Sequence, residues 1–172
     1  MKEEVSKAVD DLRDEIVTFA QELIRIPTIN PPGENYVECA NLIARKLKDD
    51  DFEVQLIEVP TEDLDYLGLK LPRVSVLGNW SGTVGKPILH LNGHYDVVPA
   101  GGGWTLDPFA GTVRRGKLYG RGASDMKGGI ASMIMAAIAL RRLRMKPMGS
   151  LFISAVPDEE TGGAAGTGYL VK

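Results

Sequence analysis

The stretch that decides the fold is LFISAVPDEETGG, residues 151–163. Its first six residues are apolar or small and are typical of a buried β-strand, while the proline and glycines that follow indicate a turn. The strand therefore delivers Asp158, Glu159 and Glu160 to one of its ends. Adjacent like charges repel, so holding two glutamates together benefits the fold only if a cation or a reaction uses them. A solvated acidic loop is the alternative.

Upstream of this strand, apolar helical patterns alternate with β-rich segments. An apolar helix is predicted at about 130–143, and PILHLN, residues 87–92, is predicted to be a short buried strand. Two further strands are predicted at 52–59 and 73–77. Alternation of this kind is typical of the α/β class.

The remaining segments predict two helices and two loops. Apolar residues at helical spacing predict one amphipathic helix over 5–24 that ends near Pro27, and a second helix at 35–48. The segment 61–72, TEDLDYLGLKLP, is interpreted as an irregular loop or an edge hairpin. The glycine-rich stretch 93–122 has too few apolar residues for a core and predicts a long functional loop.

Composition narrows the function classes. The chain has 172 residues, 44% of them hydrophobic, which suffices for a core without disulfides. A net charge of -3 provides no basic stripe for nucleic acid, and no apolar run is long enough for a bilayer. The start is too polar for a secretory signal, and the single cysteine, Cys39, is expected to be a buried, inert thiol. We therefore expect a cytoplasmic protein.

Polar residues cluster at the ends of the predicted elements. His94 and Asp96 follow one strand, Asp125 precedes the apolar helix, and Glu159 with Glu160 follows the last strand. In an open α/β sheet, ligand sites collect at strand ends on one edge. We therefore expect these segments to converge.

The HYD sequence suits a metal ligand with its orienting partner. In extended backbone His94 and Asp96 point to the same side, so the carboxylate is able to hold one ring nitrogen while the other binds a metal. A histidine that merely hydrogen-bonds in the core is the alternative for His94. For His90, a satisfied and buried strand histidine is the favoured interpretation.

The carboxylates allow two interpretations each. Asp125 lies among glycines before a helix, so it could cap that helix or be approached from two sides as a bridge between two cations. Glu159 and Glu160 diverge as neighbours, so one could coordinate a metal while the other takes a proton from the bound water and passes it to a leaving nitrogen. Histidine and carboxylates without thiolates suit zinc, cobalt or manganese.

Other chemistries fit poorly. The string GASDM fails the GxSxG pattern of a nucleophile elbow, Lys86 is followed by proline instead of Ser or Thr, and GRGASD lacks the third glycine of a dinucleotide fingerprint. A regulatory or binding domain with a relic metal site remains the alternative of another class, and tightly bound metal is what discriminates the two.

Three motifs together resemble the co-catalytic metallopeptidases and deacylases that include acetylornithine deacetylase, succinyl-diaminopimelate desuccinylase, carboxypeptidase G and aminoacylase. They are LNGHYDVVPAGGGW at 91–104, GKLYGRGASDMKGG at 116–129 and SAVPDEETGG at 154–163, in the family's order. The resemblance implies a three-layer α/β catalytic domain with a central mixed sheet, incomplete at its C-terminus here. It also implies hydrolysis of an amide bond in N-acyl amino acids or peptides, in deacetylase, desuccinylase, carboxypeptidase or dipeptidase fashion.

The resemblance also implies residue roles. His94 would bind the first of two zinc ions and Asp96 would orient it; Asp125, followed by a cis peptide, would bridge the ions. Glu160 would bind the second ion and Glu159 would be the general base. Cobalt or manganese could replace zinc.

The family's dimerisation domain, later carboxylate and C-terminal histidine are not in this sequence. We therefore expect an N-terminal part of a catalytic domain, 1–172, that is inactive alone and belongs to a homodimeric parent.

Overall fold

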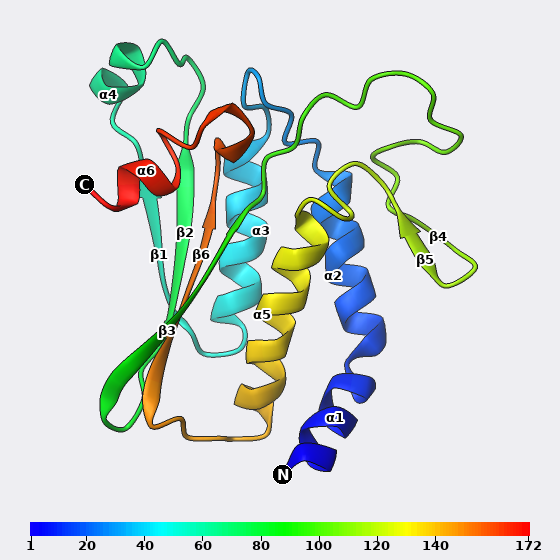
Figure 1. Cartoon of the computed structure of the whole chain (residues 1–172), viewed down its shortest axis with the longest axis vertical. Helices are drawn as coiled ribbons and strands as arrows, with labels where there is room; N and C mark the ends of the chain where they lie inside the picture. Colours follow the sequence, from blue (N-terminus) through cyan, green and yellow to red (C-terminus); the bar gives the residue numbers. More distant parts are fainter.

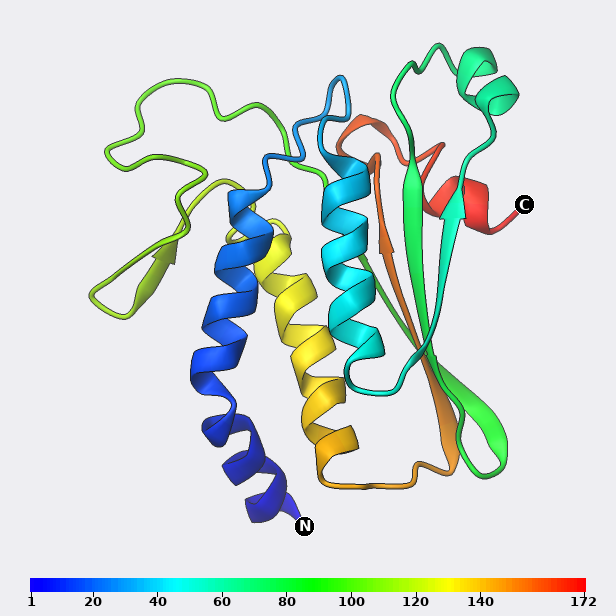
Figure 2. The same cartoon turned by 180° about the vertical axis from the view of Figure 1, so that it is seen from behind.

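The computed structural model describes residues 1–172 and shows a four-stranded sheet with helices packed on one face (Figures 1 and 2). The sheet strands are β1 (Glu53–Glu58), β2 (Val74–Trp80), β3 (Gly85–His94) and β6 (Gly149–Val156). A separate hairpin consists of β4 (Thr112–Arg114) and β5 (Lys117–Tyr119). The helices are α1 (Lys2–Asp11), α2 (Arg13–Arg25), α3 (Tyr36–Lys48), α4 (Thr61–Tyr66), α5 (Lys127–Arg142) and α6 (Thr167–Leu170).

The strand order is β1-β2-β6-β3, with antiparallel pairs at β1/β2 and β2/β6 and a parallel pair at β3/β6. The predicted α/β class and mixed central sheet are confirmed. Parallel neighbours need a crossover connection, which α5 supplies between β3 and β6. As a result, the loops after β3, before α5 and after β6 gather at one end of the molecule (Figure 1).

The core lies between the sheet and helices α2, α3 and α5. On β2, Val74, Val76 and Trp80 are buried at alternate positions, and a Cβ at Gly78 would lie 3.0 Å from Leu47 of α3. Burying each large aliphatic side chain contributes about 1.5–3 kcal/mol relative to exposure, so this layer carries much of the stability. Cys39 is fully buried in the same core, where desolvation raises the pKa of its thiol to about 11, as its predicted inertness requires.

Two sequence predictions about the first 72 residues are wrong. The single helix predicted over 5–24 is divided between α1 and α2 at Leu12, whose ψ of 1° departs from the helical value of about −42°. The segment predicted as a loop or hairpin contains α4, which buries Leu64. Acidic residues in the first turn of α4 favour the helix, since they complement the positive end of its dipole.

Residues 87–92 form a strand, as predicted, but the prediction that this strand is buried is wrong. They lie within β3, but β3 is an edge strand that pairs only with β6, so Ile88 and Leu89 are each 60% exposed. None of the helices combines the length and apolar character needed to span a lipid bilayer.

Candidate active site

The parallel pairing of β3 with β6 builds the candidate site. His94 is the register partner of Val156, and the N–H of Tyr95 donates to the carbonyl of Val156 at 3.0 Å. The carboxyl ends of both strands therefore lie at the same end of the sheet. The HYD segment and the two glutamates after β6 meet there, although more than sixty positions separate them in the sequence.

His94 lies at the centre of an acidic group. Its Nε2 lies 3.0 Å from Oδ1 of Asp125 and 3.7 Å from Oε2 of Glu159. His94, Asp125 and Glu160 each offer one atom that could bind a metal, and these three atoms lie within 4.8 Å of one another. The structure thus brings together the residues that the sequence predicts as metal ligands, with the predicted general base beside them.

Asp96 holds the other side of the imidazole. Nδ1 of His94 lies 3.1 Å from the carbonyl oxygen of Asp96 and 3.3 Å from its carboxylate Oδ1. An Nδ1–H donated to this residue leaves the Nε2 lone pair free for a metal ion. The contact expected within HYD is therefore present, shared between the carbonyl and the carboxylate.

Charges at this site perturb one another. Burial opposes the charge of His94, but hydrogen bonds from the ring to Asp96 and Asp125 prevail and raise its pKa to about 9. Burial also opposes the charge of Asp96, but hydrogen bonds from His94, Asn30 and Glu160 lower the pKa of that carboxyl. Desolvation, together with the neighbouring Asp125, Asp96 and Glu159, raises the pKa of Glu160. A cation would relieve this repulsion among carboxylates.

Asp125 does not cap helix α5. The helix has Met126 at its N-cap position with no side-chain cap bond, and the side chain of Asp125 is 79% exposed. The Asp125–Met126 peptide is cis, as the family resemblance implies. With capping set aside, the carboxylate is available to the site.

The donor set fits a divalent metal. One imidazole nitrogen and two carboxylates, with open positions around exposed Asp125, are the ligand types of catalytic zinc, cobalt or manganese sites. A structural zinc site would use thiolates, and the only cysteine is in the core.

His90 is not part of this group. Its Nε2 lies 2.8 Å from Oγ of Ser154, and its ring packs edge-to-face on Phe152. Its hydrogen bonding is satisfied, as predicted, but the prediction that it is buried is wrong, because its side chain is exposed on the edge strand β3.

Sequence reasoning missed a set of buried polar residues behind the glutamates. Asn30, Arg73 and Asp158 are each at most 3% exposed and hydrogen-bond to one another or to Asp96. The available signals were weak. Arg73 is a lone cation at the start of an apolar strand, and Asn30 is an amide in a proline turn.

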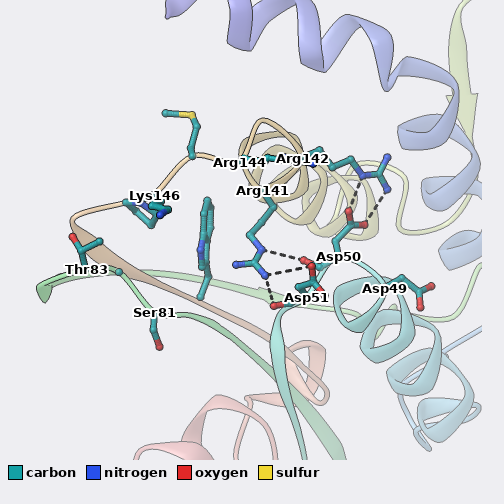
Figure 3. Close-up of a pocket in the computed structure, with 13 residues that line it drawn as sticks. Asp49, Asp50, Asp51, Ser81, Thr83, Arg141, Arg142, Arg144 and Lys146 are labelled. Atoms are coloured by element: carbon teal, nitrogen blue, oxygen red, sulfur yellow. Dashed lines mark hydrogen bonds and ion pairs between the residues drawn. The ribbon is translucent and has the colours of Figure 1, made fainter.

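A separate cavity of about 480 Å³ lies at the far end of α5 (Figure 3). There Arg142 pairs with Asp50, and Arg141 donates to the backbone oxygens of Asp50 and Asp51. These bonds clamp the end of α5 to the turn after α3. None of the predicted site residues lines this cavity, so it is distinct from the candidate site.

Comparison with known proteins identifies relatives of this chain. A family model described as peptidase family M20/M25/M40 matches residues 90–172, which hold all three motifs. A succinyl-diaminopimelate desuccinylase of Rhodospirillum centenum is 35% identical over 153 residues, which is 88% of this chain and 37% of that protein.

Two solved structures share the fold. Human carnosine dipeptidase 1 has a TM-score of 0.82 and 27% identity, over 96% of this chain and 36% of its own. The dipeptidase Dug1p of Saccharomyces cerevisiae has a TM-score of 0.82 at 23% identity, over 98% of this chain and 36% of its own. The chain thus spans little more than a third of the length of each of these three proteins.

Proposed function

Because this chain belongs, through residues 90–172, to peptidase family M20/M25/M40, we propose that its parent protein hydrolyses the amide bond of N-acyl amino acids or peptides with divalent metal ions. The observation that carries the proposal is the group formed by His94, Asp125 and Glu160 with Glu159 beside it. The relatives are hydrolases by name, so the family and the geometry agree.

In this proposal His94, Asp125 and Glu160 would hold two metal ions, zinc by preference, with Asp125 serving as a ligand of both. When bound, the ions would acidify water and polarise the amide carbonyl. Asp96 holds the ring of His94 so that Nε2 faces Asp125 and Glu159, where the metal would bind.

Glu159 is the proposed general base and acid. Hydrolysis breaks an O–H bond of water and the amide C–N bond, and forms a C–O bond and an N–H bond. Glu159 takes the proton from water and returns it to the leaving nitrogen, so that a carboxylic acid and an amine are released. Its carboxylate is 60% exposed and lies 3.7 Å from Nε2 of His94, which supports access to both water and substrate.

The favoured substrates are N-acyl amino acids, with removal of an acyl group such as succinyl or acetyl. The support is the identity of 35% to a desuccinylase over most of the chain. Dipeptide hydrolysis is the second candidate, and the 27% identity and TM-score of 0.82 to carnosine dipeptidase 1 favour it.

We further propose that residues 1–172 are the N-terminal part of the catalytic domain. The support is that the relatives are much longer. A further carboxylate, a further histidine and a dimerisation domain would then come from the rest of the parent, and the 172-residue chain alone would bind metal weakly and be inactive. A non-catalytic binding domain is the competing proposal.

The test is a substrate panel on the intact parent with zinc or cobalt added. N-succinyl and N-acetyl amino acids are assayed beside dipeptides, with and without a chelator. Chelator-sensitive release of a free amine supports the proposal and identifies the substrate class. Tight metal binding without turnover of any substrate would instead favour a binding domain.

A further inference from the structure

A buried ion pair lies directly behind the two glutamates. Nε of Arg73 donates to Oδ1 of Asp158 at 3.1 Å, and the two side chains are 0% and 4% exposed. Burying two charges costs desolvation that their attraction repays only with good geometry, and a hydrophobic pair is often at least as stable. Stability alone therefore gives little reason for this pair.

The guanidinium of Arg73 is held on every side. Nη1 donates to the carbonyl of Leu71 at 2.9 Å and Nη2 to the carbonyl of Pro32 at 3.0 Å. The group lies over the ring of Tyr36, 5.0 Å from its centroid. At Gly33 (φ 99°), a Cβ would lie 2.4 Å from Nη1, so only glycine leaves room for the guanidinium. Arg73 is thus a rigid anchor.

Asp158 passes this anchoring to the turn that carries the glutamates. Its Oδ1 also accepts the hydroxyl of Thr161 at 3.1 Å, and its Oδ2 accepts the N–H of Ala165 at 3.3 Å. Its backbone is left-handed, with φ 73°. Glu159 and Glu160 therefore lie between points that the one carboxylate fixes on both sides of them.

Asp96 holds the same turn from the side of His94. Its Oδ1 accepts the N–H of Glu159 at 3.2 Å, and its Oδ2 accepts the N–H of Glu160 at 3.1 Å. The amide of Asn30 donates to Asp96 at 2.9 Å and to Asp158 at 3.3 Å. One Nδ2 group thus joins the two carboxylates, and a continuous chain of contacts connects Arg73 to the candidate site.

We propose that Arg73 is a positioning residue that, through its ion pair with Asp158, sets the placement of Glu159 and Glu160 in the active site. The proposal rests on the proposed function. The hydrogen bonds of Arg73 go to Asp158, Leu71 and Pro32, and none goes to a predicted metal ligand. Its loss would free Asp158 to turn, and the glutamates would shift relative to the metals and the substrate.

The test compares Arg73→Lys with Arg142→Lys in the full-length parent. Lysine keeps the positive charge at position 73 but loses the three-way guanidinium contact. We expect Arg73→Lys to lower kcat about tenfold or more with KM little changed, the loss typical of removing an outer partner of a metal site. The visible absorption spectrum of the Co²⁺-loaded protein should change as well. Arg142→Lys alters another paired arginine, at the far end of α5, and should change neither.

The other possible outcomes of this experiment also test the proposal. If Arg73→Lys folds and matches Arg142→Lys in kcat and Co²⁺ spectrum, the proposal is overturned. If it does not fold, the double variant Arg73→Met/Asp158→Asn, which leaves no unpaired charge, takes its place under the same criteria. Failure of both to fold would make the pair purely structural and overturn the proposal. If the wild-type protein turns over no substrate, the proposed function fails, while the Co²⁺ spectra still test the positioning.

Discussion

His94 and Val156 are register partners on the parallel strands β3 and β6. This pairing brings the histidine to the same end of the sheet as the glutamates that follow β6. Because parallel strands end together, the relationship explains how an imidazole and carboxylates that are distant in sequence reach a common site.

Replacing Glu159 separates proton transfer from metal binding. We expect Glu159→Ala in the full-length parent to reduce kcat by about 10²–10⁴, the usual contribution of a general base. Metal content should stay close to that of the wild type, because Glu159 is not among the predicted ligands. Turnover and metal analysis of one preparation check this. A parallel loss of metal would make Glu159 a ligand and the assigned roles wrong.

The two histidines provide a matched pair for metal binding. We expect His94→Ala to weaken Co²⁺ binding more than about tenfold. Removing a residue that only orients a metal ligand already lowers metal affinity about 10–100-fold, and His94 is a predicted ligand itself. His90→Ala removes the same side chain from an exposed position next to Ser154 and should leave the affinity unchanged. Titration calorimetry measures both. Equal weakening by the two variants would place the metal elsewhere.

Asp96 serves both His94 and the glutamate turn. An amide in its place keeps the size but offers one acceptor oxygen where the carboxylate has two, and each carboxylate oxygen accepts one of the glutamate N–H groups. We expect Asp96→Asn to lower kcat about 10–100-fold. Steady-state kinetics on metal-saturated protein test this. Wild-type kinetics would mean that the Asp96 carbonyl suffices to orient His94.

Glu15 predicts a dependence of stability on acid pH. Hydrogen bonds from Arg142, aided by Lys46 and opposed by burial, lower the pKa of Glu15 to about 2 from its usual 4.5. A carboxyl with a lowered pKa stabilises the fold above its unfolded pKa, and this stability is lost as pH falls from about 4.5 to about 2. Because the side chain is 34% exposed and solvent screens its ion pairs, we expect Glu15 to contribute about 1 kcal/mol to the free energy of unfolding at neutral pH.

Chemical unfolding of the wild type and Glu15→Gln between neutral pH and pH 2 measures this contribution. The difference in free energy of unfolding should shrink toward zero at the acid end. Glu22→Gln, on the same helix and exposed, alters a residue with no ion pair and should show little difference at any pH. A constant difference across the range would exclude the linkage.

The elements that sequence predicted well are those whose pattern is local. The helical spacing at 35–48 and the apolar run before Pro157 correspond to α3 and β6. The break at Leu12 and the helix α4 were missed because a change in one backbone angle and a short acidic turn have no strong periodic signal. The exposure of β3 was missed because its sequence does not state which strand lies at a sheet edge.

By itself the sequence determined the chemistry available: an imidazole, a carboxylate two residues after it and three further acids, each at the end of an apolar segment. Only the tertiary structure decided that Asp125 faces His94 instead of capping α5, and that Arg73, Asn30 and Asp158 lie behind the glutamates. The physical reason is that side-chain chemistry and periodicity are local properties. Strand pairing and the burial of a charge depend on segments that meet only when the chain folds.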